Sequence, residues 1–319
     1  MPHSIVAKNG KAVVGLGSRL LTVENGAVTK QVTVDQSAAP KGNANFVDAL
    51  AVTPDNKHWL GIDHYGKQLV VYTQDLDVVS ARVFPKRPSA VTTAGSSALV
   101  GDKFGDVYQV PLYSTEPVCD EKGQAKIEPI LGHVSMLLNV EVYDNKWIIT
   151  GDRDEHIRVS SLAHPYVIEQ FLFGHKQYIR QLLLVGKTLV SGGGDDYVCS
   201  WDLESGEQVA QFALRQYYLG LEEIDVSVLV EYQGDILLVV EGTTKILRVS
   251  APNLELVAEY ETNDKITAVA VDGNDVYVAF ANKLRVTSSL PPQFTEIELP
   301  QSEEVPLFIQ GQLRKRPEH

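Results

Sequence analysis

The segment from Gly174 to Asp202 reads GHKQYIRQLLLVGKTLVSGGGDDYVCSWD. It begins with a Gly-His pair, continues through a Ser-Gly turn that carries Asp195, and ends on a Trp-Asp pair. A second, weaker copy begins 42 residues earlier at Gly132-His133, and Ser160-Ser161 stands there where the Trp-Asp pair would fall. The sequence therefore contains an internal repeat of about 40 residues, the length of one four-stranded propeller blade.

Short runs of Val, Ile, Leu and Tyr fill the rest of the chain, each bounded by the Gly, Asn, Asp or Pro residues that tight turns require. These runs predict an antiparallel meander. The motif Ile157-Arg158-Val159-Ser160 recurs as Leu247-Arg248-Val249-Ser250 and as Leu284-Arg285-Val286-Thr287, which extends the repeat along the chain. The one candidate for a helix is a weak pattern at residues 217–224.

The Gly-His, Asp-turn and Trp-Asp pattern is the WD-repeat signature, so we expect an all-β, seven-bladed WD-repeat β-propeller. Residues 1–319 would form this single domain, with a short basic C-terminal tail, Leu313 to Pro317, that we expect to be solvated. Six blades is the competing count, because the first and last units are the least regular. The predicted units are residues 5–36, 48–84, 88–131, 134–171, 176–212, 225–260 and 265–297.

The way in which the ring closes can also be predicted. An open propeller would expose sheet edges, and closing the ring protects them. We therefore expect the first or last residues of the chain to complete a blade that begins at the other end.

Hydrogen-bond networks are expected to lock two of the blades. In a WD repeat a loop His, a turn Asp, a strand Ser or Thr and a strand Trp can bond to one another, provided that each buried polar group is satisfied. In the fifth unit the sequence predicts a full set, made of His175, Asp195, Ser191 and Trp201. In the fourth unit it predicts a set without the Trp, made of His133, Asp154 and Thr150.

Composition argues against several classes of function. The formal charge of −13 opposes long-range attraction to a phosphate backbone, so we do not expect a stand-alone nucleic-acid binder. Cys119 and Cys199 form neither a disulfide framework nor a zinc motif. The longest apolar runs are too short to span a membrane, and the first residues do not resemble a secretion signal. The cytosol or the nucleus is the expected compartment.

Enzyme motifs are incomplete. Residues 61–68 resemble a P-loop, but Gln68 replaces the Ser or Thr that would hold magnesium, and a strand-like run follows in place of a helix. Asp195 and Asp196 are adjacent carboxylates, but the first is assigned to the blade network and the second is interpreted as a solvated neighbour. The eight histidines show no metal-ligand spacing. We therefore predict no catalytic residue and no metal site.

Three consecutive units resemble a known family, the non-catalytic WD-repeat subunit of eukaryotic tRNA (guanine-N(7)-)-methyltransferase. Two features of these units, Ser-Met-Leu-Leu after Gly-His and the Asp-Arg-Asp-Glu run, are not general to WD repeats. The runs that carry the resemblance are GDKFGDVY at 101–108, LGHVSMLL at 131–138 and GDRDEHIRVS at 151–160, with FGH at 173–175 and GGGDD at 192–196.

The resemblance implies a scaffold without a catalytic group of its own. Such a subunit binds, stabilises and orients a separate methyltransferase subunit in a heterodimer, and reaches tRNA mainly through that partner. The partner holds S-adenosylmethionine and forms N(7)-methylguanine in the tRNA variable loop, so no cofactor is expected on this chain. The complex is expected in the nucleus, and also in the cytoplasm.

The same resemblance assigns the partner-binding residues. In the family, a basic residue at the position of Arg158 pairs with an acidic residue of the methyltransferase subunit. His156 lies two residues earlier, on the same strand face, and Lys103 lies in the matching run of the preceding unit, so both are placed in the interface.

Two alternatives stay open, because fold alone does not decide function. One is a different WD-repeat scaffold, such as a ubiquitin-ligase or chromatin adaptor. The other is an enzyme-like propeller, such as a metal-dependent hydrolase, which would need carboxylates that converge on the central channel.

Overall fold

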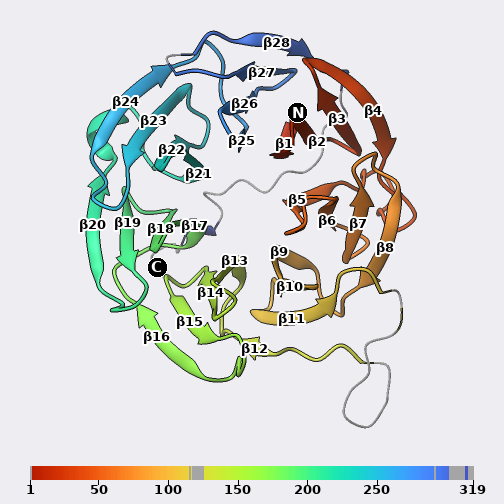
Figure 1. The fold of residues 1–319 in the computed structure, drawn as a ribbon, viewed down its shortest axis with the longest axis horizontal. Coiled ribbons are helices and arrows are strands. Elements are labelled where there is room, and N and C mark those ends of the chain that lie inside the picture. The colour runs from red at the N-terminus through yellow and green to blue at the C-terminus, as the bar shows by residue number, and fades with distance from the viewer. Residues whose placement is uncertain (1, 115, 117–125, 291, 302–312, 315–319) are drawn as a thin grey trace.

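The computed structural model describes residues 2–114, 116, 126–290, 292–301 and 313–314. In these ranges the chain forms seven four-stranded antiparallel sheets, arranged as the blades of a ring around a central channel (Figure 1). The prediction of an all-β, seven-bladed propeller is confirmed, and the six-bladed alternative is wrong. A single 3-10 turn, η1 (Arg215–Tyr217), ends at the first residue of the segment 217–224 where a weak helix was expected, and the expectation is wrong because residues 218–224 form turns and irregular structure.

Each blade is built from four consecutive strands that follow one another from the centre of the ring to its rim (Figure 1). Blades 1 to 4 consist of β1 (Pro2–Lys8), β2 (Lys11–Leu16), β3 (Arg19–Glu24) and β4 (Ala27–Thr33); β5 (Val47–Val52), β6 (His58–Asp63), β7 (Gln68–Thr73) and β8 (Val78–Val83); β9 (Pro88–Ala94), β10 (Ser97–Asp102), β11 (Asp106–Pro111) and β12 (Leu131–Gly132); and β13 (Leu137–Tyr143), β14 (Trp147–Asp152), β15 (Ile157–Ser161) and β16 (Ile168–Leu172). Blades 5 to 7 consist of β17 (Ile179–Val185), β18 (Thr188–Gly193), β19 (Tyr197–Asp202) and β20 (Gln208–Ala213); β21 (Val226–Tyr232), β22 (Asp235–Val240), β23 (Lys245–Ser250) and β24 (Leu256–Glu261); and β25 (Ala268–Asp272), β26 (Asp275–Ala279), β27 (Lys283–Thr287) and β28 (Thr295–Glu298).

The pattern of side chains changes with the position of a strand in its blade. Middle strands such as β14 and β22 are covered on both faces by neighbouring blades, which explains their nearly continuous apolar runs. Outer strands such as β4 and β24 alternate between partly buried and exposed side chains, because only one face packs against the protein. The core therefore lies between the blades as a series of apolar layers.

The ring closes without a shared blade. The described residues of blade 1 and blade 7 each supply all four of their own strands, so the expectation that one chain end completes the other end's blade is wrong. Tight turns let each blade form from nearby residues, which keeps the entropy cost of loop closure low. Side chains hold the ring shut instead: Leu21 and Ala12 of blade 1 share an apolar cluster with Tyr277 and Leu284 of blade 7.

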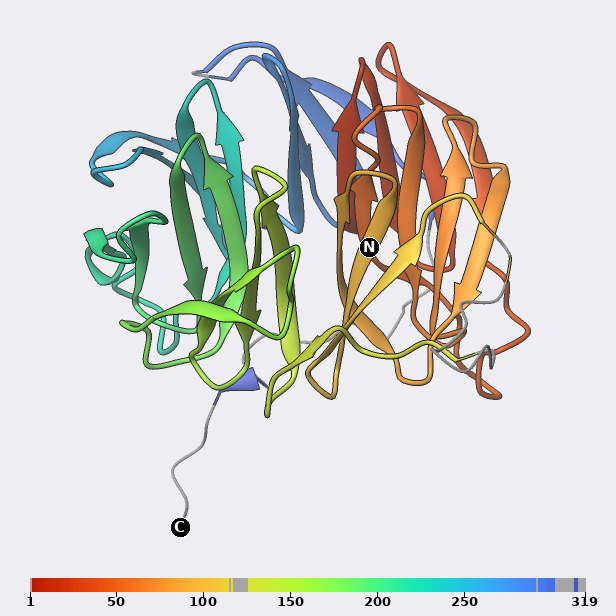
Figure 2. The same cartoon turned by 60° about the horizontal axis from the view of Figure 1, so that its bottom comes forward.

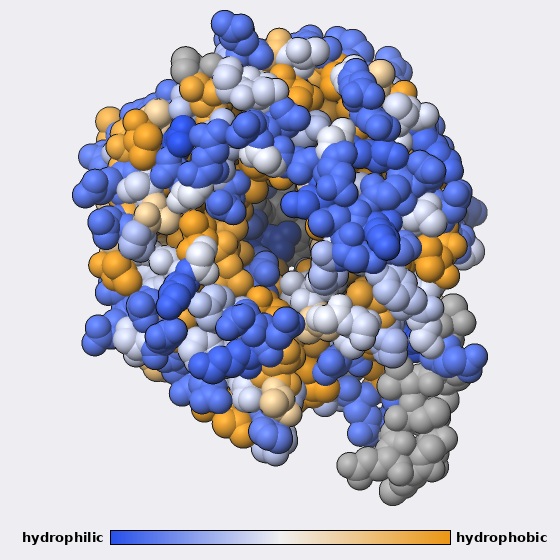
Figure 3. Space-filling view, in the orientation of Figure 1, coloured by the Kyte–Doolittle hydropathy of each residue, from blue (hydrophilic) through white to orange (hydrophobic). Residues whose placement is uncertain are grey.

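The described part of the C-terminal tail lies against one face of the ring. In Figure 2 the short coloured segment Leu313–Arg314 lies beneath the blades, and Leu313 is 3% exposed. The expectation of a solvated tail is therefore wrong for these two residues, while residues 315–317 and Cys119 lie outside the described residues. Figure 3 looks onto the opposite face, where a mainly hydrophilic surface surrounds a central hollow. The described residues contain no helix with the length and hydropathy of a membrane span.

Candidate partner-binding surface

The blade 5 network brings together the four side chains that the sequence places in it. His175 Nε2 lies 2.7 Å from Ser191 Oγ, and Trp201 Nε1 donates to the same oxygen at 2.8 Å. Because the indole can only donate, the serine hydroxyl is free to donate its own proton to His175 Nε2. Nδ1 of His175 then carries the ring proton and donates to Asp195 at 2.8 Å. All four side chains are buried, so the network is a structural lock.

The blade 4 network uses a different carboxylate from the one predicted. His133 Nε2 lies 2.7 Å from Thr150 Oγ1, and its Nδ1 lies 3.0 Å from a carboxylate oxygen of Asp152. The assignment of this role to Asp154 is wrong, because Asp154 contributes only its backbone N–H, which donates to Asp152.

Strand geometry explains the difference between the two blades. Asp152 is the last residue of β14, and Asp63 and Asp102 occupy the same place at the ends of β6 and β10. The corresponding residue of β18 is Gly193, whose Cα approaches the carbonyl oxygen of Tyr178 too closely to carry a side chain. Blade 5 therefore takes its carboxylate from Asp195, two residues later, and this spacing does not transfer to blade 4.

Arg158 lies in the interior of blade 4 and is 7% exposed. Its Nε donates to Ser160 Oγ at 2.7 Å, Nη1 to the carbonyl oxygen of Gly132 at 3.0 Å, and Nη2 to that of Pro165 at 3.1 Å. Burial lowers the pKa of the guanidinium, but these three acceptors keep the charge solvated by the protein itself. The structure thus places Arg158 beneath the surface, with every guanidinium nitrogen already donating within the chain.

His156 lies on the turn between β14 and β15, and its side chain is 44% exposed. The carboxylate of Asp152 holds this turn: it accepts from the His156 backbone N–H at 2.9 Å and lies 3.2 Å from His156 Nδ1. Burial raises the pKa of Asp152, but hydrogen bonds from His133 and from the His156 backbone outweigh that effect and leave it below its usual value. Glu155 has φ +69°, a left-handed conformation that a non-glycine residue adopts only when its surroundings fix it.

Two phenylalanines extend the surface outward from His156. The Phe171 ring stacks on the Phe173 ring with centroids 5.7 Å apart, and the His156 ring lies edge-on to both, at 6.4 and 6.5 Å. Phe173 is 69% exposed. Phe171 is the cross-strand neighbour of Arg158, so the two residues occupy paired positions of β15 and β16.

Lys103 belongs to the adjoining turn of blade 3. Its Nζ lies 5.3 Å from the centroid of the exposed Phe104 ring, and Lys86 Nζ lies 4.6 Å from the same ring. Gly105 follows with φ +100°, and its carbonyl oxygen accepts from the backbone N–H of His133.

Gly105 brings the blade 3 turn against the loop that carries Val134. A Cβ on Gly105 would collide with the carbonyl oxygens of His133 and Ser135, so the two segments are in direct contact. Val134, between them in sequence, is fully exposed. We define the blade 3/4 aromatic surface by its five exposed or partly exposed side chains: Phe104, Val134, His156, Phe171 and Phe173.

The two phenylalanines of blade 4 were not among the interface residues predicted from the sequence, although the sequence contains a signal for them. Phe171 and Phe173 flank Leu172, which is fully buried at the end of β16. Strand alternation therefore turns both rings to the outer side of an outermost strand, where exposed side chains are usually polar. Aromatic residues at two such positions indicate a contact surface.

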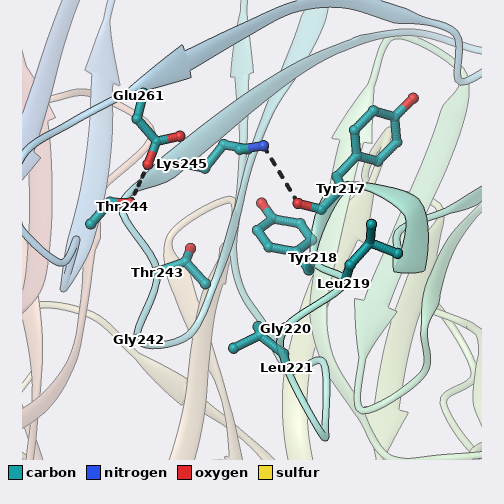
Figure 4. Close-up of a pocket in the computed structure, with 10 residues that line it drawn as sticks. All are labelled: Tyr217, Tyr218, Leu219, Gly220, Leu221, Gly242, Thr243, Thr244, Lys245 and Glu261. Atoms are coloured by element: carbon teal, nitrogen blue, oxygen red, sulfur yellow. Dashed lines mark hydrogen bonds between the residues drawn. The ribbon is translucent and has the colours of Figure 1, made fainter.

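The described residues contain no candidate metal centre. Among them, no three His, Cys, Asp or Glu side chains converge to hold a metal ion, so the hydrolase-like alternative gains no support. A hollow of about 390 Å³ lies between the η1 segment and the turn before β23 (Figure 4). Its one amine is engaged within the chain: Lys245 Nζ donates to the Tyr217 carbonyl oxygen at 3.4 Å and to Glu259 at 2.9 Å. The Tyr218 hydroxyl in the same lining is buried without a hydrogen-bond partner among the described residues.

A sequence profile of the tRNA methyltransferase TRM82 WD40 domain matches residues 16–128 and 119–293. The chain belongs to this family. The matched ranges include both blade networks and the whole blade 3/4 aromatic surface. Family membership therefore covers the part of the ring on which the candidate surface lies.

Curated relatives carry the same family name. The tRNA (guanine-N(7)-)-methyltransferase non-catalytic subunit TRM82 of Debaryomyces hansenii is 36% identical over 211 residues, which cover 60% of this chain and 46% of the relative. The protein of the same name from Meyerozyma guilliermondii is 40% identical over 184 residues, which cover 54% of this chain and 43% of the relative. The matched part of the chain thus spans less than half the length of these relatives.

Solved structures support the fold alone. The chain is similar to the computationally designed Ika8 protein, with a TM-score of 0.67 and 16% identity over 95% of this chain and 89% of that one. A chain of the mitotic checkpoint complex gives a TM-score of 0.70 and 12% identity over 88% of this chain and 86% of that one. At these identities the likeness says that the chain is a propeller and nothing about its partners.

Proposed function

We propose that this chain is the non-catalytic subunit of a tRNA (guanine-N(7)-)-methyltransferase. It binds, stabilises and orients a separate catalytic subunit, which holds S-adenosylmethionine and contacts most of the tRNA. Membership of the TRM82 family and the names of the curated relatives support this proposal.

The observation that carries the proposal is the blade 3/4 aromatic surface. Phe173 and Val134 are well exposed and lie in the two connections that flank blade 4, in the part of the chain where the family resemblance is most specific. Burying exposed aromatic rings contributes more to association than burying most other side chains, and such rings are enriched at the centres of protein interfaces. A surface of this kind fits a protein partner better than a nucleic acid.

Basic groups at the edge of this surface supply its charge. Lys103 and Lys86 flank the Phe104 ring. These side chains are placed to meet acidic residues of the catalytic subunit. The chain as a whole carries a charge of −13, which complements a partner that bears the basic tRNA-binding surface.

The role that we propose for Arg158 follows from its burial. Direct pairing with a partner carboxylate would require the guanidinium to leave the carbonyl oxygens of Gly132 and Pro165. We propose instead that Arg158 supports the interface indirectly, because it ties the Gly132 loop and the Pro165 loop to β15, the strand that pairs with the strand of Phe171. His156 and Lys103 remain proposed direct contacts.

Co-expression with the catalytic subunit tests the function. We expect the two chains to purify together as a heterodimer that methylates N7 of guanine in the variable loop of tRNA, with greater stability than either chain has alone. A chain that stays monomeric beside the catalytic subunit, and leaves its activity unchanged, would contradict the proposal and favour another scaffold role. Nuclear residence is part of the proposal, and a fluorescent fusion of the full chain checks it.

A further inference from the structure

The C-terminal residues Leu313 and Arg314 are joined to blades 4, 5 and 6. Leu313 packs against Leu138 and Tyr178 in an apolar cluster on the same face as the β14–β15 turn. Its carbonyl oxygen accepts a hydrogen bond from Arg153 Nε at 3.1 Å. A residue 160 positions away in the sequence thus contacts the turn that carries His156.

Arg314 occupies an acidic site next to this cluster. Its Nη2 lies 3.0 Å from a carboxylate oxygen of Asp225 and donates to the carbonyl oxygen of Ile224 at 2.6 Å. Its Nε lies 3.4 Å from Glu223. The Tyr178 hydroxyl donates to the same Asp225 carboxylate at 2.5 Å. This buried carboxylate therefore links Arg314 of the tail to Tyr178, the residue before β17.

Arg153 connects this anchor to the partner-binding surface. Its backbone N–H donates to the Met136 carbonyl oxygen at 2.9 Å, and its side-chain Nε donates to the Leu313 carbonyl oxygen at 3.1 Å. Three residues further on, His156 faces Phe171 and Phe173. The turn therefore contacts the tail through Arg153 and the exposed phenylalanine rings through His156.

We propose that Leu313 and Arg314 are positioning residues that fix the β14–β15 turn and so hold His156 in its place in the blade 3/4 aromatic surface. The effect on partner binding rests on the proposed function, whereas the fixing of the β14–β15 turn does not. A surface that is fixed before association loses less conformational entropy on binding, so an anchored turn binds the partner more tightly. The left-handed backbone at Glu155 adds a reason for an anchor, since such a conformation persists only where its surroundings determine it.

Hydrogen exchange in the full isolated chain tests the structural step. In Arg314→Ala, the carboxylate of Asp225 loses its cation and the tail loses its strongest link to the ring. We expect the amide protons of Arg153 and His156 to exchange about ten times faster than in the wild type, and Arg314→Lys to give rates in between. Wild-type rates at both amides in Arg314→Ala would overturn the proposal.

A matched control separates anchoring from general destabilisation. Arg248 also pairs with an acidic residue, Asp235 at 2.6 Å, but lies on the third strand of blade 6, away from the turn. Arg248→Ala should leave the exchange of Arg153 and His156 at wild-type rates. Equal acceleration of these amides in both variants would show a global effect and overturn the proposal.

Affinity for the catalytic subunit tests the consequence. We expect Arg314→Ala to raise the dissociation constant about tenfold, a change of roughly 1.4 kcal/mol, and Arg248→Ala to leave it unchanged. An unchanged affinity in Arg314→Ala, with the turn loosened, would overturn the positioning role. If the wild-type chain itself does not bind, the proposed function fails, while the exchange experiment still decides whether the anchor exists.

Discussion

Phe171 and Phe173 stack on the rim of blade 4 with ring centroids 5.7 Å apart, while Leu172 between them is fully buried. The buried leucine packs in the core between blades, and the two rings lie on the outer side of the strand. An exposed aromatic pair of this kind adds little to the stability of the isolated chain. Its contribution is expected when a partner covers it.

Truncation at neighbouring positions should separate these two roles. Phe173→Ala should change the free energy of unfolding by less than about 0.5 kcal/mol, as for other surface substitutions. Leu172→Ala removes fully buried methyl groups and should cost about 2–5 kcal/mol. Urea denaturation of the isolated chain measures both values. A large loss in Phe173→Ala would mean that its ring packs into the fold and would remove it from the proposed surface.

Arg158 should behave as a structural residue. Arg158→Ala leaves the carbonyl oxygens of Gly132 and Pro165 without their donors, at a cost of about 1–3 kcal/mol for each unsatisfied buried group. Arg285 occupies the same repeat position in blade 7, but its partner Glu296 is largely open to water. Arg285→Ala should therefore destabilise the chain less. Equal losses would contradict the special structural role of the Arg158 hydrogen bonds.

Asp152 should contribute to the acid sensitivity of the fold. Its pKa lies below the usual 3.8, because hydrogen bonds from His133 and the His156 backbone outweigh the opposing effect of burial. A carboxyl with a depressed folded pKa stabilises the protein above its unfolded pKa, and this stability is lost as the pH falls through the folded value. Asp152→Asn should flatten the loss of stability below about pH 4 in denaturation curves. Asp154→Asn should keep the wild-type slope, and the reverse result would restore Asp154 to the network.

Glu141 should have the opposite effect on the pH dependence of stability from Asp152. It lies on β13, close to Thr92 of β9, and burial raises its pKa to about 7 against a usual value of 4.5, although a hydrogen bond from Thr92 opposes the shift. Its cost to stability therefore begins as the pH rises above 4.5 and is complete above pH 7. The stability of Glu141→Gln relative to the wild type should increase as the pH rises from about 5 to about 8. Thermal unfolding of both proteins across this pH range measures the difference. A difference that does not vary with pH would contradict the raised pKa.

Local sequence patterns were sufficient to predict the fold. Each blade closes through short turns, so the repeat around Gly174 to Asp202 determined the strand order of its own unit, and the same pattern gave seven blades. The Asp154 assignment failed because the spacing in blade 5 depends on Gly193, which has no counterpart in blade 4.

These local patterns could not predict contacts between residues far apart in the sequence. The burial of Arg158 depends on carbonyl oxygens from two separate loops, and the anchor joins Leu313 to Arg153 across 160 positions. The exposure of Phe171 and Phe173 follows from alternation along β16, but only once that strand is known to be the outermost of its blade. Closure by side chains between blades 1 and 7 likewise follows from packing and has no local motif.

The most direct test of the account is the affinity of this chain for its catalytic subunit when the blade 4 rings are removed. We predict that Phe171→Ala combined with Phe173→Ala raises the dissociation constant at least about tenfold, that is by roughly 1.4 kcal/mol or more. Leu219→Ala, at an exposed apolar side chain beside η1, should leave the dissociation constant at the wild-type value. Wild-type affinity in the double variant, with its fold intact, would contradict the claim that the blade 3/4 aromatic surface binds the methyltransferase.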